Sequence, residues 1–170
     1  MSSQPMFHSN LIPTEGLVVP EGLTLRPLAN TDYDRGFLQL LSQLTTVGDI
    51  SYEVFFERFN SMANTSPKSY YVVVLEDDST KAIVGAATLV IEWKFIHSAS
   101  CRGRVEDVVV DESQRGKKLG QLLNQVLVQM AKKIGVYKLS LECKDALIPF
   151  YEKFGYKVDK GNNFLVQRFD

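Results

Sequence analysis

Residues 111–123 read DESQRGKKLGQLL and mark the point where a predicted strand turns into the longest predicted helix. The apolar residues downstream recur at spacings of three and four, which predicts an amphipathic helix over residues 117–134. The start of a helix carries positive partial charge and favours carboxylates. This start instead holds cations and glycines, and glycine lowers helix stability. These residues are Arg115, Lys117 and Lys118, with Gly116 and Gly120.

A bound anion would explain this composition. Glycines four residues apart remove side chains from the helix start, so a ligand can approach backbone N–H groups that have no partner within the helix. The cations then complement a dianionic group such as a pyrophosphate. The spacing differs from those of a P-loop and of a dinucleotide-binding motif, and a nucleic-acid patch would need interleaved aromatic residues. A solvated basic turn is the alternative. The glycines favour a ligand that carries a pyrophosphate.

Length, charge and cysteine content narrow the class of protein. The chain has 170 residues, enough for one domain with a sizeable core. Its net charge of −1 provides no global field for nucleic acid or an anionic membrane, so we expect neither as a partner. The 2 cysteines lack metal-ligand spacing, so we expect no metal and a reducing compartment. There is no signal pattern, and the apolar runs fall far short of the ~20 residues that span a bilayer. We expect a cytoplasmic protein.

Periodicity and turn signals predict a flexible arm over residues 1–21 and a single domain over residues 22–170. The predicted order is β-α-α-β-β-β-α-β-α-β-β. Strands are expected at residues 23–28, 69–76, 81–95, 104–110, 137–143, 156–159 and 164–169, and helices at 31–44, 51–62, 117–134 and 146–154. An antiparallel run leads into a β-α-β unit, which requires one parallel pairing. The fold class is therefore α/β with a mixed sheet.

Residues 104–110 read RVEDVVV, a strand with two adjacent acids. Strict alternation would place Glu106 and Asp107 on opposite faces. Carboxylates inside an apolar strand need partners, and a structural salt bridge would supply them. The alternative is a substrate site, where a carboxylate receives a proton or orients a cationic group.

Tyr151 lies in a short predicted helix directly after the strand that carries Glu142. It is either a core aromatic residue or a phenol that donates a hydrogen bond to a leaving anion. Cys143 is a poor candidate nucleophile because neither histidine of the chain is near it in sequence. Lys94 and His97 end a long strand, where exposed cations are usually solvated. With Arg168 they would form a phosphate site only if the fold brought the three together.

These segments together resemble the GNAT acetyltransferase superfamily. RGKKLG resembles its acetyl-CoA motif, with Arg115 first and Gly120 last, and PFYEKFGY resembles its second signature, which contains a Tyr. The segments LTTVGDIS, KFIH, RGRVEDVVV, YKLSLEC and FYEKFGY, in this order and spacing, are similar to the glucosamine 6-phosphate N-acetyltransferase branch. The similarity covers most of the chain from about Leu23 to the end. The resemblance implies a GNAT fold, acetyl transfer from acetyl-CoA to the 2-amino group of glucosamine 6-phosphate, and an intertwined homodimer with sites at the subunit junction.

Site residues follow from the resemblance by position. Those implied for acetyl-CoA are Val108, Val109, Val110, Arg115, Gly116, Lys117, Lys118, Leu119, Gly120, Gln121, Tyr151, Glu152 and Lys153. Those implied for the sugar phosphate are Thr45, Lys94, Phe95, Ile96, His97, Glu106, Asp107, Val108, Tyr137, Lys138, Glu142 and Arg168. Two positions depart from the pattern. Lys118 stands where the superfamily motif usually has Gly, and Leu147 stands where relatives often carry Asn, which would remove one cofactor hydrogen bond.

A mechanism follows from these parts. An amine beside electron-withdrawing oxygens should titrate near an α-amino group, about 8, and not near lysine, about 10.4, so no strong base is needed. Glu106, through water, or Glu142 would accept the proton. The backbone N–H near Val108 would polarise the thioester carbonyl, and Tyr151 would stabilise the leaving thiolate. Two alternatives remain open: an acetyltransferase for another amine, such as a polyamine or a protein lysine, and a non-catalytic acetyl-CoA-binding module.

Overall fold

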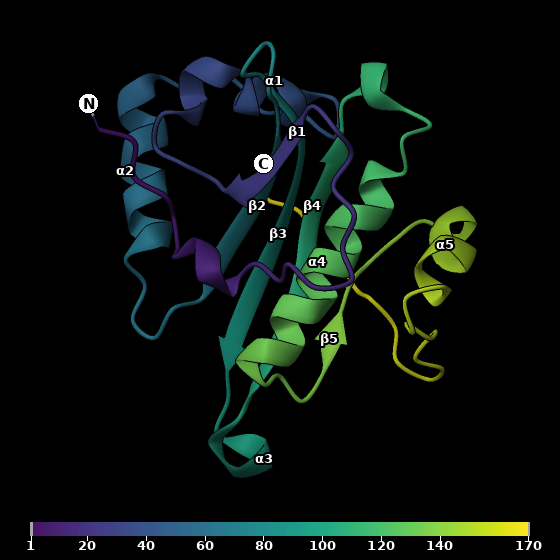
Figure 1. Cartoon of the computed structure of the whole chain (residues 1–170). Coiled ribbons are helices and arrows are strands. Elements are labelled where there is room, and N and C mark those ends of the chain that lie inside the picture. Colours follow the sequence, from purple (N-terminus) through teal and green to yellow (C-terminus); the bar gives the residue numbers. More distant parts are fainter. Residues whose placement is uncertain (1, 170) are drawn as a thin grey trace.

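A computed structural model describes residues 2–169, so Met1 and Asp170, the outer ends of the predicted arm and domain, lie outside it. Its core is a five-stranded sheet in the order β1-β2-β3-β4-β5 (Figure 1). The strands are β1 (Leu23–Pro27), β2 (Tyr70–Asp77), β3 (Ile83–Trp93), β4 (Cys101–Val110) and β5 (Leu139–Ser140). The α-helices are α1 (Phe37–Ser42), α2 (Tyr52–Ala63), α3 (Ile96–Ala99), α4 (Leu119–Ile134) and α5 (Ile148–Glu152). Four 3-10 turns are η1 (Ser9–Leu11), η2 (Asp32–Arg35), η3 (Glu112–Gln114) and η4 (Asp145–Leu147).

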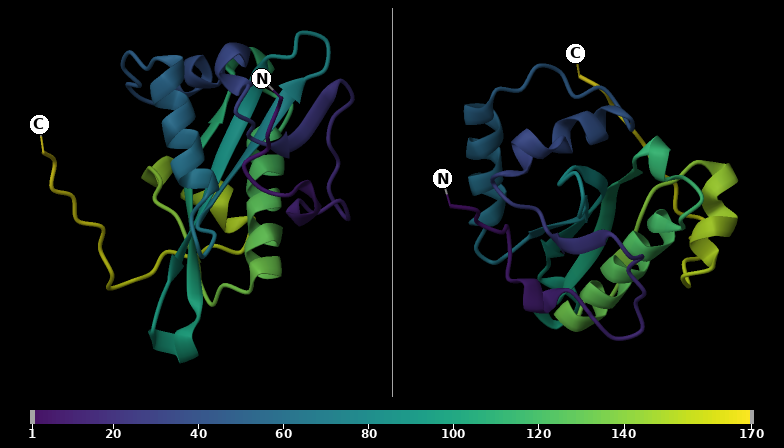
Figure 2. Two further views of the ribbon diagram at one scale, coloured as in Figure 1. Left: turned by 90° about the vertical axis from the view of Figure 1, so that its left-hand side faces the viewer. Right: turned by 45° about the horizontal axis from the view of Figure 1, so that its top comes forward.

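The pairing confirms a mixed sheet. Strands β1 to β4 pair antiparallel, and β4 pairs with β5 in parallel. Helix α4 makes the crossover between β4 and β5, as a parallel pair requires. Figure 2 shows α2 and α4 on opposite sides of the sheet. Because both faces are covered, β2 is buried along nearly its whole length, with Val73, Val74 and Leu75 at 0% exposure.

The two longest helices form where the sequence predicts them. Helix α2 is capped by Ser51, whose side chain accepts a hydrogen bond from the Val54 N–H. Helix α4 buries its apolar stripe and stops at Gly135, whose N–H bonds the carbonyls of Ala131 and Lys132. It begins two residues later than predicted, because Lys118 has a left-handed backbone conformation (φ 58°) that cannot belong to the helix.

Two other predicted helices are shorter and interrupted. The helix expected over residues 31–44 is split into η2 and α1, because Gly36 between them has φ 82°. The helix expected over residues 146–154 starts as η4 and becomes α5, which ends at Glu152.

The C-terminal strands are the main error of the sequence-based prediction. The strand expected over residues 137–143 is reduced to β5, and residues 156–159 and 164–169 form no strand. A strand needs a partner, and within one chain this segment runs away from the sheet as exposed coil (Figure 2).

The N-terminal segment is packed, which differs from the expected flexible arm. Met6, Phe7 and Ile12 are buried in the main core, and the Met6 N–H bonds the Leu28 carbonyl at 2.7 Å. Apolar side chains of this size gain about 1.5–3 kcal/mol each from burial, which favours docking of the segment. The domain boundary at residue 22 stays a prediction. Among residues 2–169, no helix is long and apolar enough to cross a membrane.

Candidate active site at the fork between β4 and β5

Strands β4 and β5 form a fork. They pair only at Gly103 with Leu139 and at Arg104 with Ser140. Beyond these pairs β4 continues to Val110, whereas the segment after β5 leaves the sheet towards α5 (Figure 1). Within residues 2–169, no strand pairs this edge of β4 beyond Arg104. Those backbone groups of residues 108–110 that point away from β3 are therefore available to bond an extended ligand in the manner of an added strand.

A bulge in β4 shapes the fork and corrects the expected alternation. Glu106 faces Thr88 on β3, but Val109 faces Ala86, so β4 holds one residue more than its partner. Asp107 lies at this bulge. Its backbone has φ 51°, and the residue lies at the protein surface. Protein atoms near the Asp107 carboxyl displace part of its hydration, and this desolvation, followed by the charge of the neighbouring Glu106, raises the pKa of Asp107.

The start of α4 has the features of an anion site. Lys118 precedes the helix, and within the described chain no side chain caps the helix start, so the first N–H groups remain available. A side chain at Gly120 would meet only the Phe150 ring at 3.9 Å, an ordinary contact, so packing does not require glycine there. The missing side chain instead leaves room for a ligand. Gly116 has a different cause, because its φ of 86° suits glycine. The exposed cations complete a site that fits a pyrophosphate.

Gln43, which the sequence did not indicate, anchors this loop. It follows α1, and its side-chain amide donates to Asp111 Oδ2 at 2.8 Å and accepts from the Glu112 N–H at 3.0 Å. The other Asp111 oxygen accepts from the Ser113 N–H and hydroxyl. The bonds from Ser113 and then Gln43 lower the pKa of Asp111. The loop that leads into α4 is therefore held from α1.

The two predicted acids, Glu106 and Glu142, come together at the mouth of the fork, by which we mean the point where β4 and the chain after β5 separate. The guanidinium of Arg104 contacts Glu106 through Nε and Glu142 through Nη2. All three side chains are partly exposed, so a ligand can reach the carboxylates. Sequence reasoning missed Arg104, although alternation along β4 places it on the same face as Glu106.

Tyr151 lies beyond the fork on α5 in an aromatic cluster. Its ring packs edge-on against Phe150 and Tyr156, with centroids 5.0 and 5.9 Å away. Burial, and then Cys143, raise the pKa of the Tyr151 phenol. The phenol therefore keeps its proton at neutral pH and acts as a donor. Glu152 and Lys153 follow at the end of α5 and are exposed.

The residues predicted to bind the sugar phosphate are spread over the chain. Lys94 pairs with Glu92 at 2.7 Å, and His97 stacks on Tyr137 with ring centroids 4.1 Å apart. Phe95 and Ile96 project from the hairpin tip at α3, and Lys138 is exposed beside β5. Thr45 follows α1 in the chain, and Figure 1 shows α1 at the opposite end of the molecule from the hairpin tip at α3.

Arg168 lies on the extended C-terminal segment. A single chain thus unites Glu106 and Glu142, but not Thr45, the hairpin tip and Arg168.

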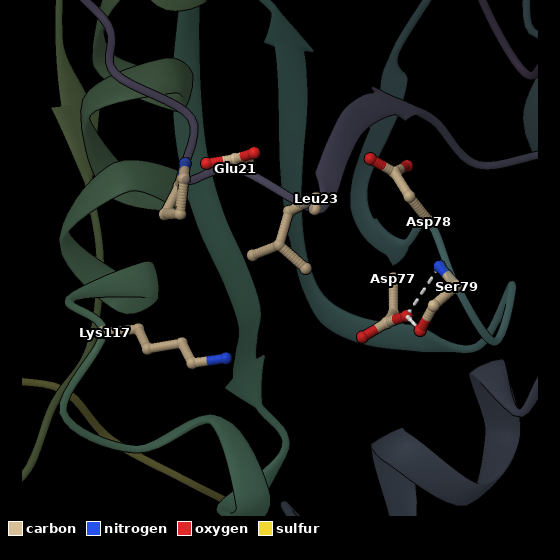
Figure 3. Close-up of a pocket in the computed structure, with 8 residues that line it drawn as sticks. Glu21, Leu23, Asp77, Asp78, Ser79 and Lys117 are labelled. Carbon is tan, nitrogen blue, oxygen red and sulfur yellow. Dashed lines mark hydrogen bonds between the residues drawn. The ribbon is translucent and has the colours of Figure 1, made fainter.

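A hollow of about 470 Å³ lies beside the loop that precedes α4, but its lining has the wrong charge for an anion (Figure 3). Lys117 points into it opposite Glu21, Asp77 and Asp78. Asp77 accepts hydrogen bonds from the Ser79 hydroxyl, the Thr80 N–H and the Ser79 N–H, which lower its pKa to about 2. These bonds form a turn rather than a ligand site. In the part of the chain that is described, no three His, Cys, Asp or Glu side chains are grouped to hold a metal.

Known proteins resemble the chain in sequence and fold. Residues 35–156 match the Acetyltransferase (GNAT) family. The chain is 51% identical over 149 residues to the probable glucosamine 6-phosphate N-acetyltransferase of Drosophila melanogaster, which covers 87% of this chain and 67% of that protein. It is 40% identical to the glucosamine 6-phosphate N-acetyltransferase of Candida albicans, over 83% of this chain and 93% of that one. The crystal structure of glucosamine-6-phosphate N-acetyltransferase from Arabidopsis thaliana superposes with a TM-score of 0.82 at 33% identity, covering 88% of this chain and all of that one.

Proposed function

Because the chain belongs to the GNAT acetyltransferase family, we propose that it transfers an acetyl group from acetyl-CoA to the 2-amino group of glucosamine 6-phosphate. The products are N-acetylglucosamine 6-phosphate and CoA. The similarity to relatives that carry this activity in their names supports the choice of acceptor. The observation that carries the proposal is the fork, whose mouth holds two reachable carboxylates and whose far end adjoins an uncapped, glycine-containing helix start.

The donor site follows from the fit described above. GNAT acetyltransferases use acetyl-CoA as co-substrate, which supplies an activated thioester. The free edge of β4 at Val108, Val109 and Val110 would hold its pantetheine arm. The N–H groups from Gly116 to Gln121, with the side chains of Arg115, Lys117 and Lys118, would hold its pyrophosphate. Leu147 has no side-chain amide, so its side chain can offer the donor only apolar contact.

Three side chains carry the proton chemistry in this proposal. Glu106 and Glu142 flank the place where the acceptor amine would lie, and either accepts its proton as the new amide bond forms. Tyr151 donates a hydrogen bond to the developing thiolate, since its raised pKa keeps it protonated. Holding donor and acceptor together at the fork supplies a large share of the rate.

A homodimer is part of the same proposal. The C-terminal segment exposes Phe164, Leu165 and Phe169, and the hairpin tip exposes Phe95 completely. Large apolar side chains gathered on exposed segments mark interaction surfaces. A second copy that covered them would also bring Arg168 and the hairpin to the other chain's fork. A cytoplasmic location and a role in supplying UDP-N-acetylglucosamine complete the proposal, and the free cysteines, Cys101 and Cys143, are compatible with a reducing compartment.

The test is CoA release from acetyl-CoA with four acceptors side by side: glucosamine 6-phosphate, glucosamine, spermidine and a lysine peptide. We expect the phosphorylated sugar to have the highest kcat/KM. Equal or better turnover of another amine would overturn the assignment of the acceptor. Binding of CoA without turnover of any amine would instead indicate a non-catalytic module.

A further inference from the structure

Arg104 occupies the last paired position of the β4–β5 fork. It lies opposite Ser140. Glu106 comes two residues later on β4, and Glu142 comes two residues after the end of β5. Residues two apart on a strand share a face of the sheet, so Glu106 faces the same side as Arg104. The Glu142 carboxylate reaches the same guanidinium from the segment after β5. Arg104 contacts one oxygen of each, which leaves the three-residue group with one net negative charge.

Without Arg104, two like charges would face each other across the mouth of the fork. An amine bound there would be favoured in its ammonium form, because nearby negative charge raises the pKa of a basic group. An ammonium has no lone pair and cannot attack a thioester. The guanidinium opposes this effect by neutralising one of the two charges.

We propose that Arg104 is a positioning residue that holds Glu106 and Glu142 together and lowers the pKa of the bound acceptor amine, so that the amine is free to attack. This inference rests on the proposed function, because it places an amine at the two carboxylates. It assigns Arg104 no contact with the donor or with the reacting atoms.

Other charged and ionisable groups surround the fork without taking this role. Asp107 lies at the bulge of β4, and Cys143 and Tyr151 lie on the side of α5. Further down the hairpin, Arg102 pairs with Glu92 at 2.8 Å, and Glu92 also pairs with Lys94. Arg102 therefore provides a matched control: it lies on the same strand and face as Arg104, its side chain is exposed to a similar extent (30% against 27%), and its carboxylate partner lies outside the fork.

The first measurement is the pH dependence of kcat at saturating substrates. In Arg104→Gln we expect the midpoint of the acid limb to move up by about one pH unit, because the ammonium form of the amine loses a neighbouring like charge that disfavoured it. Arg104→Lys keeps the charge, so its midpoint should stay at the wild-type value although kcat falls. Arg102→Gln should leave the midpoint unchanged.

The second measurement needs no turnover. Calorimetric titration with glucosamine 6-phosphate at pH 7, without a donor and in two buffers of different ionisation enthalpy, counts the protons released on binding. We expect the wild-type chain to release more protons than Arg104→Gln, because its bound amine has the lower pKa. A purely structural role would change the melting temperature and leave proton release unaltered.

Three outcomes would overturn the proposal. One is an unchanged midpoint and unchanged proton release in Arg104→Gln. Another is a rise in KM for the phosphorylated acceptor alone at an unchanged midpoint, which would make Arg104 a phosphate ligand. The third applies if Arg104→Gln does not fold: a shifted midpoint in Arg104→Lys, which keeps the positive charge, would then overturn the proposal. Failure of the proposed function is a separate result, in which the wild-type chain turns over no amine.

Discussion

Asn124 on α4 gives a sharp test of how this core is packed. Its side chain is fully buried, and neither Nδ2 nor Oδ1 has a hydrogen-bond partner within residues 2–169. A buried amide without a partner costs about 1–3 kcal/mol, whereas an apolar side chain of similar shape avoids this cost. Asn124→Leu should therefore raise the free energy of unfolding by about 1–3 kcal/mol. For a chain of this length, each kcal/mol raises the melting temperature by about 2–4 °C.

Urea unfolding and calorimetry at pH 7 would measure the change, with an unchanged m-value showing that the unfolded state is not responsible. The matched control is Gln125→Leu at the next, partly exposed position, where we expect a change within about 0.5 kcal/mol. The opposite exchange at the fully buried neighbour, Leu123→Asn, should destabilise by more than about 2 kcal/mol. A clear loss of stability in Asn124→Leu would refute the reasoning, because it would mean that the amide has a partner, such as an internal water, whose bonds leucine cannot replace.

Three further predictions concern the site and its surroundings. Tyr151→Phe should lower kcat by about tenfold to a hundredfold, since it removes one donor to the leaving group, while the calorimetric Kd of acetyl-CoA stays within about twofold; an unchanged kcat would remove Tyr151 from the mechanism. Gln43→Glu places a second carboxylate against Asp111 and should weaken CoA binding about fivefold to tenfold. Adding Asp111→Asn restores a hydrogen-bond donor between the two side chains and should recover the affinity. A double variant that binds CoA as weakly as Gln43→Glu would contradict the anchoring role. Hydrogen bonds from Arg102 and then Lys94 lower the pKa of Glu92 to about 2, so its contribution to stability is present above the ordinary carboxyl pKa and is lost as the pH falls towards 2. Glu92→Gln should therefore lower the urea midpoint at pH 7 and reduce the further loss between pH 7 and pH 3, and an unchanged pH dependence would argue against this ion pair.

Local patterns predicted the elements whose stability depends on one buried face. The apolar stripe of α4 and the Ser51 cap of α2 could both be recognised in the sequence, because helix periodicity and capping are properties of short sequence stretches. The parallel β4–β5 pair followed from the helix between the strands. The break at Gly36 and the bulge at Asp107 were missed because each depends on how the chain meets its neighbours.

The sequence motifs pointed to the elements of the candidate site but not to the side chains that support it. The glycine and cation pattern led to the start of α4, and the adjacent acids led to β4. Arg104 carried a signal, namely its position two residues before Glu106, but its bond to Glu142 joins β4 to the segment after β5, 38 residues later in the chain. Gln43 carried none, since it precedes Asp111 by 68 residues. Side chains that position a site from a distance depend on the fold and have no local spacing to reveal them.

The C-terminal strands show a different limit, because there the pattern was present and the partner was not. Residues 164–169 have the composition of a strand, yet Phe164, Leu165 and Phe169 are 60%, 88% and 85% exposed. The sheet ends at β5, which is only two residues long, and within residues 2–169 this segment pairs with no strand. Exposed apolar strands are a liability that proteins normally cover. The homodimer proposed above would cover this segment and would bring its Arg168 to the fork of the other subunit. In that homodimer, the partner subunit would complete both the scattered set of residues predicted for the sugar phosphate and the pairing that the C-terminal segment lacks.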